Sequence, residues 1–208
     1  MRAILILTVL LTLVGCQSAT PTPEASIQPG LQTITERVRI DDEMIDQGDP
    51  WTVIDPVSWT VNIYDGEAEY NNSLAPFSRE QRYMLAILLY MGEVNNGGHD
   101  QFYFNSTGIV WKDALAGFRD MGLDQAVAIL EESAQRMGDN PSLDRETRQE
   151  QMDAYKPTFD DLDDRFYDLQ ATGSLDVAMQ EYLAQHREAF YYEGDVTKLE
   201  LQAPSPED

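Results

Sequence analysis

The sequence predicts a single all-α domain with several helices, carried behind a cleaved signal and a flexible tether. Two observations favour this fold class. The 208 residues are 42% hydrophobic, which is enough to build one core. Within residues 31–202, apolar residues recur every three or four positions, and capping residues, Gly or Pro separate the runs. No internal repeat divides this stretch, so we expect one acidic domain over 31–202 and a loose tail over 203–208.

The first fifteen residues predict a secretory signal. Arg2 precedes an apolar run, Ala3–Val14, that would span about 18 Å as a helix. The core of a bilayer is about 30 Å thick, so this run is too short for an ordinary membrane span. A positive residue, a short apolar run and small residues behind it are typical of a signal peptide over residues 1–15.

Cys16 predicts a lipid anchor. Leu13-Val14-Gly15-Cys16 resembles a bacterial lipobox, which implies cleavage before Cys16, diacylglycerol on its thiol and an acyl chain such as palmitate on its amino group. The alternative is a spent signal followed by an incidental buried cysteine. Residues 16–30 are rich in Pro, Ser and Thr, and we expect a disordered tether there. Gln17 resembles an outer-membrane address, which predicts a lipid-anchored protein of the bacterial cell envelope, on the outer membrane and facing the periplasm.

The elements before residue 78 have weak signals. Asp before Pro is typical of a helix start, with the Asp as cap and the Pro as first helical residue. The expected elements are a helix over Leu31–Gln47 with Ile34, Val38 and Ile45 inside, short helices begun by Asp49-Pro50 and Asp55-Pro56, and a helix end or strand over Trp59–Tyr64.

From residue 78 onwards the helical signals are stronger. Ser78 and Gln81 form a capping box ahead of an apolar face, and this helix should end at Asn95–Gly98, where Asn and Gly suit left-handed geometry. Further helices are expected over Val110–Met121, from a capping Asp124 to Gly138, over Asp144–Tyr155 and Phe159–Leu169, and as one long helix from Ser174 to Phe190, while Thr197–Leu201 alternates weakly.

The charge excludes several classes of partner. The chain has 37 acidic and 14 basic residues, a formal net charge of −23. Such a surface repels phosphate groups, which argues against direct binding of nucleic acid or of an anionic membrane. The expected partner is a protein with a basic surface, and the expected link to the membrane is the lipid anchor. One cysteine excludes an internal disulfide and a cysteine-based zinc site.

The most unusual segment runs from Glu93 to Gly108. Gln101 and Asn105 lie four residues apart, so they share one face of a helical turn, where their amides can satisfy groups left free by the turn. The residues that define the segment are Glu93, Asn96, Gly97, Gly98, Gln101, Phe102, Asn105 and Gly108.

The pattern E-x-x-N-G-G-x-x-Q-F-x-x-N-S-x-G resembles the signature of a bacterial all-α family of unknown function named for a DNA-mimic protein. The resemblance covers about Trp51–Tyr192 and includes Ser78–Arg82 and the element Leu162–Tyr167. It implies the all-α fold and an acidic surface of the DNA-mimic type. The namesake is an acidic dimer that occupies the DNA-binding surface of a transcription factor, so the resemblance leaves a homodimer open.

A row of acidic residues is the candidate binding face. Asp160, Asp164 and Asp168 fall four residues apart, about 6 Å from one to the next along a helix, which approaches the spacing of phosphates on one DNA strand. Asp153 and Asp161 flank this row. The alternative interpretation is a hydrated helix face that serves only solubility.

No metal, cofactor or catalytic residue is predicted. The acidic residues near the start of the domain lack the spacing of a calcium loop, and the pairing of His99 with Asp100 and Glu93 is too sparse for a metal site. The sequence has no recognised nucleophile, phosphate-binding or dinucleotide motif. The alternative function is an enzyme acting on an envelope glycan, with Glu93 as general acid and with Gln101 and Asn105 orienting the sugar.

Overall fold

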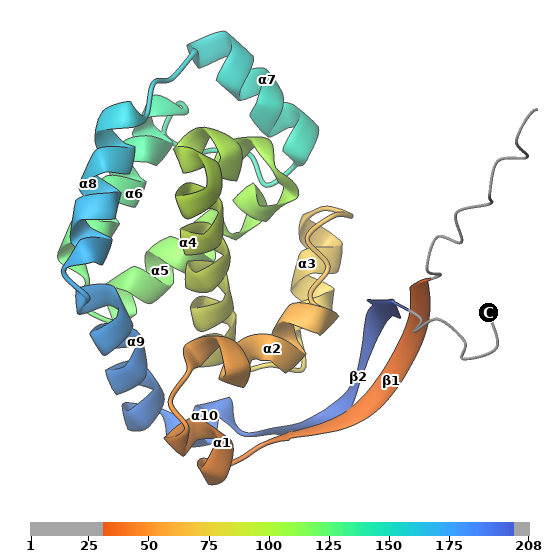
Figure 1. Ribbon diagram of the computed structural model, residues 1–208. Helices are drawn as coiled ribbons and strands as arrows, with labels where there is room; N and C mark the ends of the chain where they lie inside the picture. Colours follow the sequence, from red (N-terminus) through yellow and green to blue (C-terminus); the bar gives the residue numbers. More distant parts are fainter. Residues whose placement is uncertain (1–30, 202–208) are drawn as a thin grey trace, which may run out of the picture.

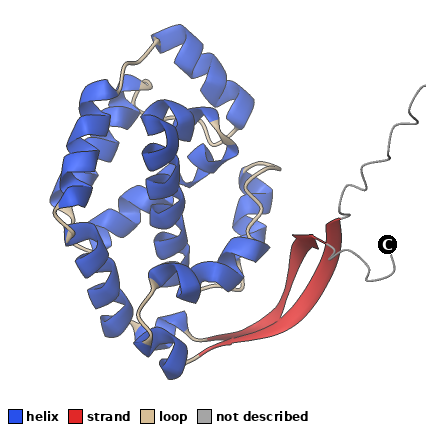
Figure 2. Cartoon of the chain, viewed as in Figure 1, coloured by secondary structure: helices blue, strands red, loops and turns tan. Residues whose placement is uncertain are grey.

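The computed structural model describes residues 31–201. The predicted signal, Cys16, the tether and the tail at 203–208 lie outside the described residues. Most of the described chain is helical, which confirms the all-α prediction (Figure 2). The helices are α1 (Asp42–Asp46), α2 (Pro50–Thr60), α3 (Glu67–Leu74), α4 (Arg79–Phe104), α5 (Trp111–Asp120), α6 (Asp124–Arg136), α7 (Arg145–Tyr155), α8 (Asp160–Ala171), α9 (Ser174–Gln185) and α10 (Arg187–Phe190), with a 3-10 helix η1 (Ser106–Val110) after α4.

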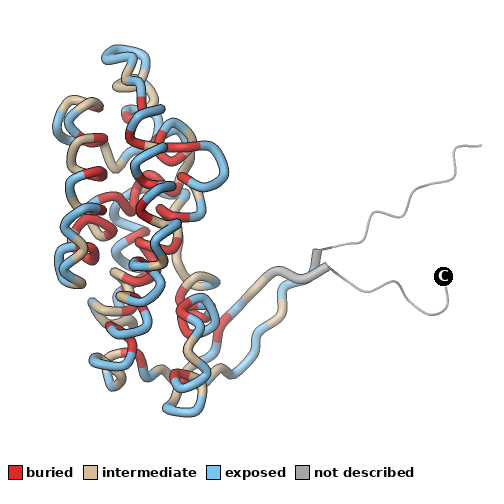
Figure 3. The backbone as a smooth tube through the Cα atoms, turned by 60° about the vertical axis from the view of Figure 1, so that its left-hand side comes forward, coloured by how far each residue is buried: buried red, intermediate tan, exposed pale blue. Residues whose placement is uncertain are grey.

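Helix α4 forms the axis of the helical body, and the other helices surround it (Figure 1). The predicted capping box begins it: the Ser78 hydroxyl accepts the Gln81 N–H at 3.0 Å, and the Gln81 side chain accepts the Ser78 N–H at 2.9 Å. Helix α4 packs against α2, α5, α7, α8 and α10. A helix that buries residues on several sides belongs at the centre of a core, and in Figure 3 the buried residues lie mostly on the inward sides of the helical body.

The ring of Tyr90 joins three of these helices. It meets the rings of Phe102, Phe118 and Phe166 edge-on, with centroids 5.0, 5.7 and 5.1 Å away. Edge-on aromatic pairs add attraction to the area that they bury. The second half of α4, helix α5 and helix α8 are therefore fixed to one another around Tyr90.

The N-terminal prediction of a helix over Leu31–Gln47 is wrong. Residues Leu31–Ile40 form strand β1, which pairs antiparallel with strand β2 (Tyr192–Leu201), from Leu31 opposite Leu201 to Ile40 opposite Tyr192. Only the last part of the expected helix is helical, as α1, where Ile45 is buried as predicted. The two strands form a ribbon that projects from the helices (Figure 1).

The two faces of the ribbon differ in polarity, as expected of a strand pair with one face toward the helices. Residues Ile34, Val38 and Ile40 alternate with exposed polar residues along β1, and Ile40 and Val196 are buried against the helices. On the opposite face, Arg37 forms ion pairs with Glu193 and Asp195. The alternation at Thr197–Leu201 was thus a true strand signal, and it extends back to Tyr192.

Four smaller predictions need correction. Pro56 lies inside α2 rather than at the start of a helix, and Trp59 and Thr60 end α2, so no strand forms there. Asp124 is the first residue of α6, and the preceding Leu123 occupies the cap position without a side-chain bond. The long helix expected from Ser174 to Phe190 is divided at His186 into α9 and α10. Within residues 31–201, no helix is long and apolar enough to cross a membrane.

Candidate functional site

The Asn-Gly-Gly segment interrupts α4 without ending it. Gly97 has φ −162° and ψ 30°, and Gly98 has φ 70° and ψ −174°, so the helical path breaks at the predicted place and then resumes to Phe104. Gly98 needs its freedom twice over: its φ is left-handed, and a Cβ there would lie 2.2 Å from Oδ2 of Asp163. A Cβ at Gly97 would lie 2.3 Å from Oε1 of Gln101. Both glycines therefore make room for neighbouring polar side chains.

The Glu93 carboxylate is the centre of an internal network. Its Oε2 accepts hydrogen bonds from the amide of Gln101 at 2.7 Å and the amide of Asn105 at 2.9 Å, and its Oε1 accepts the Thr107 hydroxyl at 2.7 Å. Gln101 and Asn105 thus lie on one face as predicted, and both side chains point to Glu93. Three neutral donors hold one carboxylate, which ties the break in α4 to the start of η1.

His99 belongs to a buried network that the sequence interpretation missed. Its Nδ1 lies 2.5 Å from Oδ1 of Asp163, which also accepts the His99 backbone N–H at 2.9 Å. Its Nε2 lies 2.7 Å from the hydroxyl of Tyr90. A carboxylate only accepts, so Nδ1 carries a proton, while Nε2 and the Tyr90 hydroxyl share a second hydrogen bond. Burial raises the pKa of Tyr90 well above its ordinary value, which keeps this hydroxyl protonated.

Asp163 makes α8 part of the motif. It lies in the Leu162–Tyr167 element of the predicted resemblance, and it fastens α8 to the break in α4 through His99. The hydroxyl of Tyr167 in the same element donates to the carbonyl of Val94 at 2.8 Å. In the sequence, the Leu162–Tyr167 element was the signal from which a contact between the Glu93–Gly108 segment and α8 could have been predicted.

Arg148 of α7 holds the end of α4. Its guanidinium is buried and donates to the carbonyls of Tyr103 at 2.7 Å, Asn105 at 2.6 Å and Ser142 at 2.7 Å. Burial lowers the pKa of Arg148 to about 10. A Cβ at Gly108 would lie 2.6 Å from its Nε, which accounts for that glycine of the motif.

Asn96 is the polar motif residue that these networks leave out. It is exposed and lines a hollow of about 510 Å³ together with Asp100, Gln101, Phe104, Asn105 and Met152. The Phe104 ring is 52% exposed there. Partial burial, and then the charges of Asp163 and Asp160, raise the pKa of the Asp100 carboxyl. The hollow is therefore formed by the end of α4 and by α7, and Asp100 is the lining residue next to His99, which binds α8.

The predicted acidic row lies along α8. Asp160, Asp164 and Asp168 are exposed, and no ion pair neutralises them within residues 31–201. Asp161 differs, because Arg136 binds both of its oxygens at 2.6 and 2.7 Å and lowers its pKa to about 2. Asp153 is exposed on α7, separate from the row.

The single arginine of α8 does not neutralise the row. Arg165 donates to Glu132 of α6 at 2.6 Å, an interaction that holds the two helices together. Asp160, Asp164 and Asp168 thus form the part of α8 with uncompensated charge. We call these three residues the α8 row.

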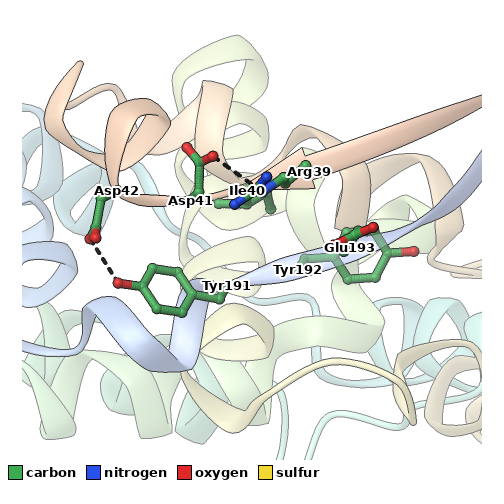
Figure 4. Close-up of a pocket in the computed structure, with 7 residues that line it drawn as sticks. All are labelled: Arg39, Ile40, Asp41, Asp42, Tyr191, Tyr192 and Glu193. Carbon is green, nitrogen blue, oxygen red and sulfur yellow. Dashed lines mark hydrogen bonds and ion pairs between the residues drawn. The ribbon is translucent and has the colours of Figure 1, made fainter.

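The acidic residues near the ribbon serve local structure. At the ribbon root, Asp41 caps α1 and lies 3.3 Å from Arg39, and the hydroxyl of Tyr191 donates to Asp42 at 2.7 Å (Figure 4). Arg187 also binds Asp42. In the described part of the chain, no group of three metal-ligating side chains lies close enough to hold an ion.

Comparison with known proteins places this architecture in a family. No curated protein and no solved structure matches the chain. A family model described as DMP19-like protein matches residues 75–186, which is more than half of the 208 residues. The matched region runs from the start of α4 to the end of α9, and so contains the whole Glu93–Gly108 segment and α8. The chain belongs to the DMP19-like family, which is named for a DNA mimic protein.

Proposed function

We propose that this protein is a lipid-anchored, non-catalytic module of the bacterial envelope that binds a protein with a basic surface. The observation that supports it best is the α8 row: three exposed carboxylates on successive turns, none of which forms an ion pair within residues 31–201. Unpaired charges of one sign on a rigid helix attract a complementary surface and raise the rate of encounter. Family membership supports an acidic surface of the DNA-mimic type.

Anchoring through Cys16 determines where this binding would occur. Export would separate the domain from cytoplasmic regulators, so the partner would be a protein of the envelope. The basic surface of that partner would take the place of the DNA-binding surface that a cytoplasmic DNA mimic occupies. Lipid anchoring on the outer membrane, facing the periplasm, follows from the lipobox and Gln17. Metabolic labelling with a palmitate analogue, compared between the native chain and Cys16→Ser, tests this part.

The geometry around Glu93 supports a non-catalytic role. A general acid must reach the oxygen that it protonates. The two oxygens of Glu93 already accept three hydrogen bonds from Gln101, Asn105 and Thr107, and Glu93 does not line the adjacent hollow. Glycan hydrolysis with Glu93 as general acid would require this network to open.

The test is affinity capture from bacterial membranes with the full-length protein in detergent. The binding variant carries Asp160→Asn, Asp164→Asn and Asp168→Asn. The control variant carries Glu67→Gln, Glu181→Gln and Glu188→Gln, which removes three exposed carboxylates from α3, α9 and α10 and changes the net charge equally. We expect the native chain and the control to capture the same partner, with binding that weakens as salt rises.

The α8 row variant should lose most of this capture. Equal loss in both variants would mean that net charge alone matters, as in the solubility interpretation. Retention by both variants, or binding that salt does not weaken, would overturn the assignment of the α8 row.

A further inference from the structure

The hollow beside the break in α4 has an unusual chemical lining. Gln101 and Asn105 each donate a hydrogen bond from their amide NH₂ group to the Glu93 carboxylate. Because a carboxylate accepts and does not donate, this fixes which end of each amide faces Glu93. Their carbonyl oxygens, Oε1 of Gln101 and Oδ1 of Asn105, have no donor within the described part of the chain.

The other polar group of the lining adds to this imbalance. Asp100 contributes a carboxylate, and the lining contains no lysine or arginine. Asn96 is exposed, and its side chain has no hydrogen-bond partner among residues 31–201. The amide of Asn96 offers donors as well, but the acceptor oxygens outnumber the donor groups of the lining and Asp100 adds a negative charge, which suits a cationic ligand with several donors.

The aromatic ring narrows the choice of ligand. Phe104 is half-exposed at the edge of the hollow. Arg145, outside the lining, already lies over this ring with its Cζ 5.7 Å from the centroid. A planar guanidinium on a flat ring is a favourable contact, and the thioether of Met152 adds an apolar wall for the methylenes of a long side chain.

We propose that this hollow receives the guanidinium of an arginine side chain of the partner protein. Asp100 would pair with the charge, the carbonyl oxygens of Gln101 and Asn105 would accept N–H groups, and the part of the Phe104 ring that Arg145 leaves exposed would lie against the guanidinium plane. Arginine carries five donors and no acceptor, which matches the acceptor oxygens of the lining. A neutral sugar fits less well, because it brings no positive charge to pair with Asp100.

This inference rests on the proposed function, since the arginine would belong to the basic surface that meets the α8 row. The connection is structural: His99, next to Asp100 in the chain, is hydrogen-bonded to Asp163 in the same first turn of α8 as Asp160. The hollow would then hold one anchor side chain, while the row supplies longer-range attraction. Buried arginine anchors often dominate the affinity of protein interfaces.

The test is an NMR titration of the isotope-labelled full-length protein in micelles. The probes are acetyl-Gly-Arg-Gly-amide, its lysine analogue and the neutral disaccharide diacetylchitobiose. We expect the arginine probe to shift the side-chain amide signals of Asn96, Gln101 and Asn105, with a Kd on the order of millimolar for so small a ligand. The lysine probe should bind more weakly, because an ammonium lacks the planar fork.

Variants separate this site from the α8 row. We expect Asp100→Asn to weaken the arginine probe about fivefold, and Phe104→Leu, which keeps the apolar bulk, about threefold. Asp176→Asn removes an exposed carboxylate from α9 and should leave Kd unchanged. The double variant Asp164→Asn, Asp168→Asn should change Kd by less than about twofold, because a small probe does not span the row.

Three outcomes of this titration would contradict the arginine site. Shifts with diacetylchitobiose but not with the arginine probe would overturn the proposal in favour of a glycan subsite. Absence of shifts at these amides, or equal effects of Asp100→Asn and Asp176→Asn, would overturn it outright. Failure of the proposed function would be seen instead as partner capture that survives neutralisation of the α8 row, which this titration does not measure.

Discussion

Two sets of carboxylates on helices α4 and α8 have opposite surroundings. Glu93 and Asp163 are each satisfied from within, the first by three side-chain donors and the second by the ring and backbone of His99. Asp160 and Asp164, one turn apart on either side of Asp163, are exposed and form no ion pair within residues 31–201. Helix α8 thus uses Asp163 to hold the break in α4 and exposes Asp160 and Asp164 beside it.

The contrast separates what the family motif does from what the surface can bind. The glycines, Glu93, Gln101 and Asn105 build a break in α4 and fasten it to η1, and Asp163 fastens it to α8. These residues therefore serve the structure of the family fold. The residues free to meet a partner are the α8 row and the lining of the hollow, of which the motif supplies Asn96 and the outward oxygens of two amides.

The largest expected effect comes from Gly98→Ala. The alanine would be strained at a φ of 70°, and its Cβ would collide with Asp163 and so loosen His99. We expect a loss of about 3 kcal/mol or more in the free energy of unfolding, measured by denaturant titration.

Gly92→Ala is the matched control for this change. Gly92 lies in the same helix, is exposed and has open space where a Cβ would stand. It should stabilise the protein by about 0.5–1 kcal/mol. Equal changes in stability for Gly98→Ala and Gly92→Ala would contradict the prediction, because they would show that the break in α4 accommodates a side chain as well as the regular helix does.

An intermediate effect is expected from Glu93→Gln. The remaining oxygen of the glutamine can still accept from Gln101 and Asn105 only if its NH₂ group turns to Thr107, whose hydroxyl must then accept instead of donate, and all the bonds lose the negative charge that strengthens them. We expect a cost of about 1–3 kcal/mol in thermal or denaturant unfolding. Glu150→Gln, at an exposed site on α7, should stay within about 0.5 kcal/mol. Full stability of Glu93→Gln, combined with the loss of a cell-wall-digesting activity seen in the native protein, would favour the glycan-acting alternative.

The smallest effect on stability is expected from neutralising the α8 row. Removing like charges four residues apart relieves repulsion, while the loss of Asp160 removes a favourable charge at the helix start. These terms oppose each other, and the change in melting temperature should correspond to less than about 0.5 kcal/mol. A large loss of stability would show that the row has structural partners and would remove the contrast with Glu93.

Local signals in the sequence predicted the helical body well. The capping box at Ser78, the helix predicted over Asp144–Tyr155 and the Asp49-Pro50 start are all present, because each depends on atoms within a few helical turns. The resemblance likewise anticipated the family. The break at Gly97-Gly98 was predicted as a helix end, since nothing local shows that α4 resumes beyond it.

Long-range contacts could not be predicted in the same way. Strand β1 was interpreted as a helix because Ile34 and Val38 fit a four-residue spacing as well as a two-residue one, and the partner strand begins about 150 residues later. The pairing of His99 with Asp163 crosses 64 positions, and the sequence interpretation placed His99 beside Asp100 instead. The acceptor-rich hollow depends on the direction of two amides, which only the folded network determines.

The ribbon has a mechanical consequence. Strands β1 and β2 bring the first and last described elements side by side, so the helical body is a loop closed by ten residue pairs. If the chain is held at a membrane while a partner grips α8, tension enters through β1. The ladder would pass part of that load to β2 as shear, so that two chain segments rather than α1 alone would carry it. The ribbon would then distribute the tension between the anchor and the α8 row over both strands.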